Sequence, residues 1–159
     1  MKIDQLILQT IPLEDFGLKW RFTEEKYNVL PEHHLSEIKP LNTDANDSLG
    51  NLLFEETGLI GHYKLNEEKF NAIIELDLRT KTDQEAKQWL KDLNIDSNET
   101  VLLFWNSWGS AITNWNIFTM YYDDFFYPAS DDLILTDKYL NWVLYFFHEE
   151  IVYYGQISK

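Results

Sequence analysis

The chain has 159 residues, of which 45% are hydrophobic and 16% aromatic, so it can bury the core of one globular domain. It carries 27 Asp and Glu against 13 Lys and Arg, and the net charge of -14 argues against direct binding of nucleic acids or anionic membranes. Cysteine is absent, which excludes disulfides and thiolate chemistry.

The N-terminal segment does not have the pattern of a secretion signal. Lys2 is followed by Asp4, and residues 1–16 hold no apolar stretch that ends in a small-residue cleavage site. No apolar run in the sequence approaches the roughly 20 residues that span a bilayer. We therefore expect a cytoplasmic protein, folded as a single globular domain over residues 1–159 because no linker-like stretch divides the chain.

The first part of the chain predicts extended pieces followed by a helix. Residues 3–11 alternate loosely and fit a short strand or an irregular extension, and residues 19–22 fit a second extended piece. Asn42 or Thr43 can cap a helix that ends just before Gly58.

The middle of the chain predicts a strand and then a helix. Residues 70–78 alternate between apolar and polar side chains, with a break only at Ile73, and predict a half-buried strand. Thr82 and Glu85 have the spacing of a capping box, in which each side chain satisfies a free backbone N–H of the first helical turn. Apolar residues then repeat on one face as far as Leu93, which predicts a helix that docks on the core.

The C-terminal half contains most of the predicted sheet. Its expected elements, in chain order, are a buried strand at 101–105, a turn at 106–110, a short helix capped by Thr113 or Asn114 and running through Tyr122, a strand at 133–135, and a hairpin of residues 142–147 and 151–157. A strand is the alternative for the short helix, and Gly155 is a candidate bulge. This order predicts an α+β fold, with a mainly antiparallel C-terminal sheet and two or three helices packed on it.

The acidic segment from Asp92 to Asp137 is the strongest functional signal. It contains eight carboxylates, no Lys or Arg, and a dense run of aromatic side chains from Phe104 onward. Acidic and aromatic side chains together offer rigid contact area and a negative field, which favours the capture of a basic protein. The sequence leaves open whether Trp105 and Trp108 face the core or the surface.

Two acidic pairs, Asp123-Asp124 and Asp131-Asp132, flank an aromatic loop that includes Tyr127. Paired carboxylates can bind a protein partner, hold Mg²⁺, or act as acid and base across a substrate. Many acidic pairs are instead solvated caps and turn residues. All of these interpretations stay open on the sequence alone.

No motif of catalysis or metal binding is found. His148 precedes Glu149 and Glu150, but neighbouring side chains point to different faces, and no second His follows at the spacing of zinc proteases. The other histidines show no recognised ligand spacing, and a calcium-loop pattern that starts at Asp44 has Leu49 where Gly is required. We therefore assign no catalytic residue, no metal ligand and no cofactor.

Several short segments carry a resemblance to known proteins. They are Lys19–Phe22, Ile38–Leu41, Glu99–Val101, Trp115–Phe118 and the aromatic hairpin that ends at Tyr154-Gly155. Together they resemble a bacterial family of short acidic proteins of unknown function. The loop from Tyr127 to Asp132, followed by His148-Glu149-Glu150, is similar to a pattern in small immunity proteins of bacterial polymorphic toxin systems. Neither resemblance implies catalytic residues.

These features predict an acidic protein-binding module, specifically an immunity or antitoxin-like inhibitor that covers the basic active site of a toxin such as a nuclease. The predicted charge partners are Asp123, Asp124, Asp131 and Asp132, with Tyr122, Tyr127, Glu149 and Glu150 at the rim. One alternative is a small metal-dependent or acid/base enzyme that uses the same carboxylates. The other is an adaptor whose acidity serves solubility.

Overall fold

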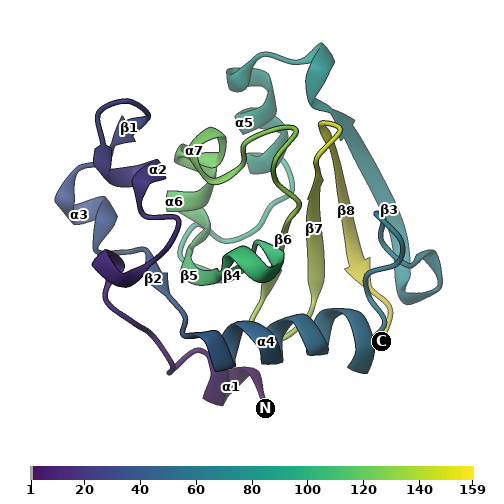
Figure 1. The fold of residues 1–159 in the computed structure, drawn as a ribbon. Helices are drawn as coiled ribbons and strands as arrows, with labels where there is room; N and C mark the ends of the chain where they lie inside the picture. The colour runs from purple at the N-terminus through teal and green to yellow at the C-terminus, as the bar shows by residue number, and fades with distance from the viewer. Residues whose placement is uncertain (1) are drawn as a thin grey trace.

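The computed structural model describes residues 2–159, which form an α+β fold with seven α-helices and a seven-stranded antiparallel sheet (Figure 1). The α-helices are α1 (Ile3–Leu6), α2 (Trp20–Thr23), α3 (Glu32–Leu35), α4 (Thr43–Asn51), α5 (Asp83–Lys91), α6 (Trp115–Met120) and α7 (Tyr122–Phe125). The strands are β1 (Asn28–Val29), β2 (Lys39–Pro40), β3 (Phe70–Asp77), β4 (Thr100–Phe104), β5 (Ser110–Asn114), β6 (Leu133–Asp137), β7 (Trp142–Phe147) and β8 (Ile151–Ile157). The expected α+β class is confirmed, with more and shorter helices than the sequence predicts.

The C-terminal half builds the sheet, and the N-terminal half completes its two edges. All neighbouring strands are antiparallel, in the order β2-β5-β4-β6-β7-β8-β3. The five central strands come from residues 100–157, whereas the edge strands β2 and β3 precede them in the chain. The short strand β1 lies outside the sheet and bridges to Thr23 and Glu24.

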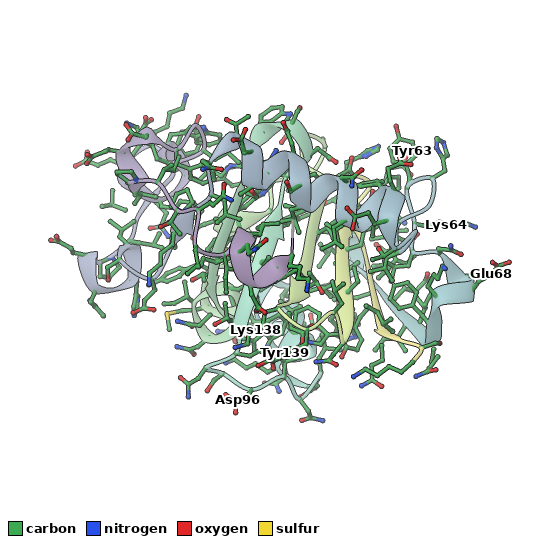
Figure 2. The ribbon with its side chains drawn as sticks, turned by 90° about the horizontal axis from the view of Figure 1, so that it is seen from below. Tyr63, Lys64, Glu68, Asp96, Lys138 and Tyr139 are labelled. Carbon is green, nitrogen blue, oxygen red and sulfur yellow. The ribbon has the colours of Figure 1, made fainter. Side chains whose placement is uncertain are left out.

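Each face of the sheet is covered by its own group of helices. On one face, α5, α6 and α7 pack on side chains such as Leu103 and Leu135. Alternate residues of the same strands, such as Leu102 and Ile134, point to the opposite face and pack with α1 and α4. Figure 2, seen from below, shows α4 crossing the strands with α1 beside it. Burial on both faces explains why the central strands are almost continuously apolar.

The elements with local sequence signals are confirmed. Thr82 and Glu85 form the capping box of α5, in which each backbone N–H donates to the other residue's side chain at 3.1 Å. Asn42 caps α4 by accepting from the backbone N–H of Ala45 at 2.9 Å, and Asn114 caps α6 in the same way. The predicted strands and the hairpin correspond to β3, β4, β6, β7 and β8.

The extended pieces predicted near the N-terminus are wrong. Ile3–Leu6 form α1, and Trp20–Thr23 form α2. Within α2 the side chains of Arg21 and Phe22 are both buried. The tertiary contacts of this single helical turn therefore outweigh its β-type composition.

The sequence also does not predict β5. Its five residues, Ser110–Asn114, follow a turn in which Asn106 has a φ of 54° and Gly109 a φ of 137°. These left-handed conformations reverse the chain sharply, and β5 then pairs antiparallel with β4.

Gly155 does not mark a bulge in β8. The irregularity lies on the neighbouring strand, between Phe70 and Ala72 of β3. A Cβ atom on Gly155 would lie 2.6 Å from Cδ1 of Phe70, which is shorter than any real contact. The close approach of the Phe70 ring therefore explains the glycine.

Candidate protein-binding surface

Asp131, one of the predicted charge partners, is buried rather than exposed. Its side chain is 2% exposed and forms a bidentate ion pair with Arg21 of α2, whose side chain is 1% exposed. Nη2 of Arg21 lies 2.8 Å from Oδ1 of Asp131, and the backbone N–H of Tyr127 donates to Oδ2 at 2.8 Å. Both carboxylate oxygens are occupied inside the fold. The prediction that Asp131 contacts a partner is therefore corrected.

Aromatic rings surround the buried guanidinium. The Cζ atom of Arg21 lies 4.7 Å from the ring centroid of Tyr127, 5.0 Å from that of Trp20 and 6.0 Å from that of Trp105. Nη1 of Arg21 also donates to the carbonyl oxygen of Phe125 at 3.1 Å. Cation–π contacts and the paired carboxylate offset the loss of water around the charge. Arg21 thus connects α2 to the loop that follows α7.

Three aromatic side chains at this connection reach the surface, and we call Trp20, Tyr27 and Tyr127 the aromatic triangle. The ring centroid of Trp20 lies 4.4 Å from that of Tyr27 and 5.6 Å from that of Tyr127. The two tyrosine rings are 6.1 Å apart. Tyr27 is 43% exposed, and the other two rings are half-buried. The triangle combines apolar contact area with two phenol hydroxyls, a composition that suits a protein interface.

Asp123 and Asp124 of α7 lie beside the aromatic triangle. Nδ2 of Asn28 donates to Oδ2 of Asp124 at 2.8 Å, and Nζ of Lys87 lies 3.6 Å from Oδ1 of Asp123. Burial raises the pKa of Tyr127, and the charge of Asp124 raises it further. Burial also raises the pKa of Asp124. Both carboxylates stay partly exposed, which makes this side of the triangle acidic.

Tyr122, predicted at the rim, lies inside the fold. It is 5% exposed, and its hydroxyl donates to Oδ1 of Asp83 at 2.8 Å. Burial, followed by this hydrogen bond, raises the pKa of the Tyr122 phenol. Because Asp83 is the first residue of α5, the bond ties α7 to α5, and the rim prediction for Tyr122 is corrected.

Asp132 binds groups at the end of β7. Its Oδ1 accepts from the backbone N–H of His148 and contacts the ring Nδ1 of the same residue, both at 3.0 Å, and Tyr145 donates its hydroxyl at 3.4 Å. Its side chain is 20% exposed. The neighbouring Glu149 is exposed and Glu150 partly exposed, in the turn between β7 and β8. Asp132 is therefore engaged within the fold, whereas Glu149 and Glu150 are more accessible to a partner.

The fold therefore separates the predicted residues into three groups. Asp123, Asp124 and Tyr127 lie at the aromatic triangle, Glu149 and Glu150 lie at the β7–β8 turn, and Tyr122, Asp131 and Asp132 bind groups of the protein itself. A hydrogen bond of 3.0 Å from the backbone N–H of Ala129 to the carbonyl of His148 connects the loop after α7 to the β7–β8 turn.

Sequence reasoning missed Trp20, Tyr27 and Arg21. The available signal was an arginine between two aromatic residues in a chain that is otherwise acidic. Its partner Asp131 is 110 residues away, so the pairing is visible only in the fold. The question left open for the tryptophans is answered as well, because Trp105 is 2% exposed and Trp108 is 56% exposed.

Comparisons with protein-family models and with curated proteins found no match to this chain. Within residues 2–159, no group of three or more His, Asp and Glu side chains is arranged to hold a metal ion. No helix of the same range is long and apolar enough to cross a membrane. What points to a function is the surface geometry and the charge of the chain itself.

Proposed function

We propose that this chain is an acidic protein-binding module, specifically an immunity-type inhibitor that covers the basic active site of a bacterial toxin such as a nuclease. The observation that carries the proposal is the aromatic triangle with Asp123 and Asp124 beside it. Aromatic anchors next to carboxylates suit the capture of a basic surface, because the rings offer rigid contact area and the carboxylates attract cations. The resemblance to immunity proteins adds the toxin to the proposal.

The buried ion pair supports this function by holding the aromatic triangle in place. Trp20 neighbours Arg21 in α2, and the backbone N–H of Tyr127 donates to Asp131. A surface that is already ordered before binding loses less side-chain entropy when the partner arrives. The Arg21–Asp131 pair thus favours binding without contacting the partner.

The charge of the chain supports a basic partner. With a net charge of -14, the protein attracts a positive surface over long range and speeds encounter, while desolvated charge pairs slow dissociation. The same charge disfavours direct contact with nucleic acids and anionic membranes. We place the action of the inhibitor in the cytoplasm, as the sequence predicts.

Affinity capture identifies the partner. Tagged protein is incubated with its native lysate at low salt, and the proteins that leave at rising salt are identified by mass spectrometry. We expect one basic protein that is released only at high salt, because surface charge attraction is screened by ions. An eluate without a basic protein contradicts the proposal.

Variants of the aromatic triangle then test the surface on the captured partner. Tyr27→Ala and Tyr127→Ala are each expected to weaken binding about 30-fold, since a hot-spot aromatic residue contributes about 2 kcal/mol. The matched control is Tyr139→Ala, which removes a tyrosine that is 67% exposed in the β6–β7 turn and labelled in Figure 2. Unchanged affinity in both triangle variants, or an equal loss in the control, would show that the partner binds elsewhere.

A further inference from the structure

The sheet has one covered edge and one open edge. At the β2 edge, the backbone N–H of Ile11 donates to the carbonyl of Pro40 at 2.9 Å, and Thr10 bridges to Leu41. At the opposite edge, β3 pairs within residues 2–159 with β8 alone. It has eight residues and runs along the outer side of β8 (Figure 1). A long open edge presents unpaired backbone groups to another strand.

Hydrogen-bond spacing identifies the outward backbone groups of β3. The N–H of Leu78 donates to the carbonyl of Glu150 at 2.8 Å, and bonded and non-bonded pairs alternate in an antiparallel ladder. In the register of β3 with β8, the bonded positions that precede Leu78 are therefore Leu76 and Ile74. The N–H and C=O groups of Ile73 and Glu75 point away from β8. The N–H of Asp77 does so as well, whereas its C=O accepts from the hydroxyl of Thr80 at 2.9 Å.

The side chains give the open edge an acidic side and an apolar side. Glu75 is opposite Tyr153 in the ladder, and burial followed by the charges of Glu75 and Glu149 raises the pKa of Tyr153, so both carboxylates lie near that ring. On the other side of β3, Ile74 is 49% exposed and follows the exposed Ala72 by two residues. A strand that fits this edge alternates basic residues, which face Glu75, with apolar residues, which face Ile74.

We propose that the open edge of β3 binds an extended segment of a basic protein, which joins the sheet as an additional strand and alternates Lys or Arg with apolar residues. The inference rests on the proposed function, because the basic partner supplies the segment. Backbone hydrogen bonds to Ile73, Glu75 and Asp77 provide affinity, and the alternating side chains provide specificity. A second copy of this chain suits the edge less well, because each copy carries a net charge of -14.

Amide hydrogen exchange of the ¹⁵N-labelled full chain tests the edge directly. The probe is a blocked peptide of alternating Lys and Val, long enough to span β3, and the control peptide replaces each Lys by Glu. The Lys/Val peptide is expected to slow exchange of the outward amides of Ile73, Glu75 and Asp77 at least about tenfold. The amides of Ile74 and Leu76, which already bond to β8, are expected to change little.

Variants at Glu75 separate the backbone contribution from the charge. Glu75→Pro removes an outward N–H and leaves the ladder to β8 intact, so it is expected to abolish the protection at Ile73 and Asp77. Glu75→Gln keeps the N–H and loses only the charge, and a few-fold weaker binding is expected. Should the proline disturb β3 itself, Glu75→Lys keeps every backbone group and is expected to reverse the preference toward the Glu/Val peptide.

Three results would overturn the proposal. They are a Lys/Val peptide that leaves the outward amides of β3 unprotected, a Glu/Val peptide that protects them equally, and protection that rises with the concentration of the protein alone, which would make a second copy the occupant. The peptide assay does not use the captured partner. A failed edge therefore leaves the capture result intact, and a failed aromatic triangle leaves the protection of β3 intact.

Discussion

The acidic pairs Asp123-Asp124 and Asp131-Asp132 are identical in sequence and lie in different environments. The first pair stays partly exposed on α7, beside the aromatic triangle. In the second pair, Asp131 is buried against Arg21, and Asp132 accepts hydrogen bonds at the end of β7. The role of a carboxylate therefore depends on the hydrogen-bond and ion-pair donors that the fold brings to it, and not on the residue beside it in the chain.

The largest effect that separates the two pairs is expected from Asp131→Asn. This change leaves the charge of Arg21 buried without its counterion, so the free energy of unfolding is expected to fall by about 3–5 kcal/mol. Urea denaturation followed by tryptophan fluorescence measures it.

The control for this variant replaces both partners. Arg21→Met combined with Asp131→Leu removes the two charges together, and it is expected to restore part of the lost stability, because the backbone N–H of Tyr127 still loses its acceptor. A loss below about 1 kcal/mol in Asp131→Asn would make the buried carboxylate equivalent to the exposed ones and remove the contrast.

An intermediate effect is expected from Asp132→Ala. The variant removes the acceptor of the backbone N–H and the ring of His148, which costs about 1–2 kcal/mol for partly buried hydrogen bonds. Glu149→Ala is the matched control, because it deletes an exposed carboxylate from the adjacent turn. Equal denaturation midpoints for the two variants would mean that Asp132 behaves as a surface residue.

The smallest effect on stability is expected from Asp123→Asn combined with Asp124→Asn, within about 0.5 kcal/mol at neutral pH. Because burial raises the pKa of Asp124 above its ordinary 3.8, the folded state binds more protons than the unfolded state. The contribution of Asp124 to stability is complete below pH 3.8 and is lost as the pH rises through the raised pKa. As the pH rises, the free energy of unfolding of the double variant is thus expected to increase relative to that of the wild type. Denaturation at several pH values measures this difference.

The same double variant is expected to have a large effect on binding. With the captured partner, stopped-flow measurements should give a slower association and a flatter dependence on salt, since two charges that attract the partner are removed. An unchanged rate and an unchanged salt slope would assign the attraction to other carboxylates, and the comparison between the pairs would then concern stability alone.

Signals confined to a few neighbouring residues predicted structure well. Thr82 and Glu85 predict α5 because a capping box is complete within four positions. The alternation along Phe70–Asp77 predicts the strand itself, although Ala72 and Ile74 are exposed because β3 lies at the edge of the sheet. β5 was not predicted, although the turn at 106–110 before it was, because Ser110–Asn114 contain one large apolar residue, Ile112, and the strand depends on pairing with β4.

The candidate surface was predictable only in part. Its acidic and aromatic content is readable from the segment around Asp123, Asp124 and Tyr127. The contribution of Trp20 and Tyr27 is not readable, because α2 joins this surface through contacts that span more than a hundred residues of sequence. The burial of Asp131 follows from the same long-range contact, so the sequence could not tell it from Asp123.

The strand order of the sheet also determines when the chain can fold during synthesis. Both edge strands and α2 are synthesised before the central strands β4 to β8. Asp131, the partner of Arg21, is synthesised 110 residues after it. Strand β3 cannot pair in the sheet until β8 has been synthesised. Chains that end before Ile157 therefore lack part of β8, the strand with which β3 pairs, and expose apolar surface of the sheet.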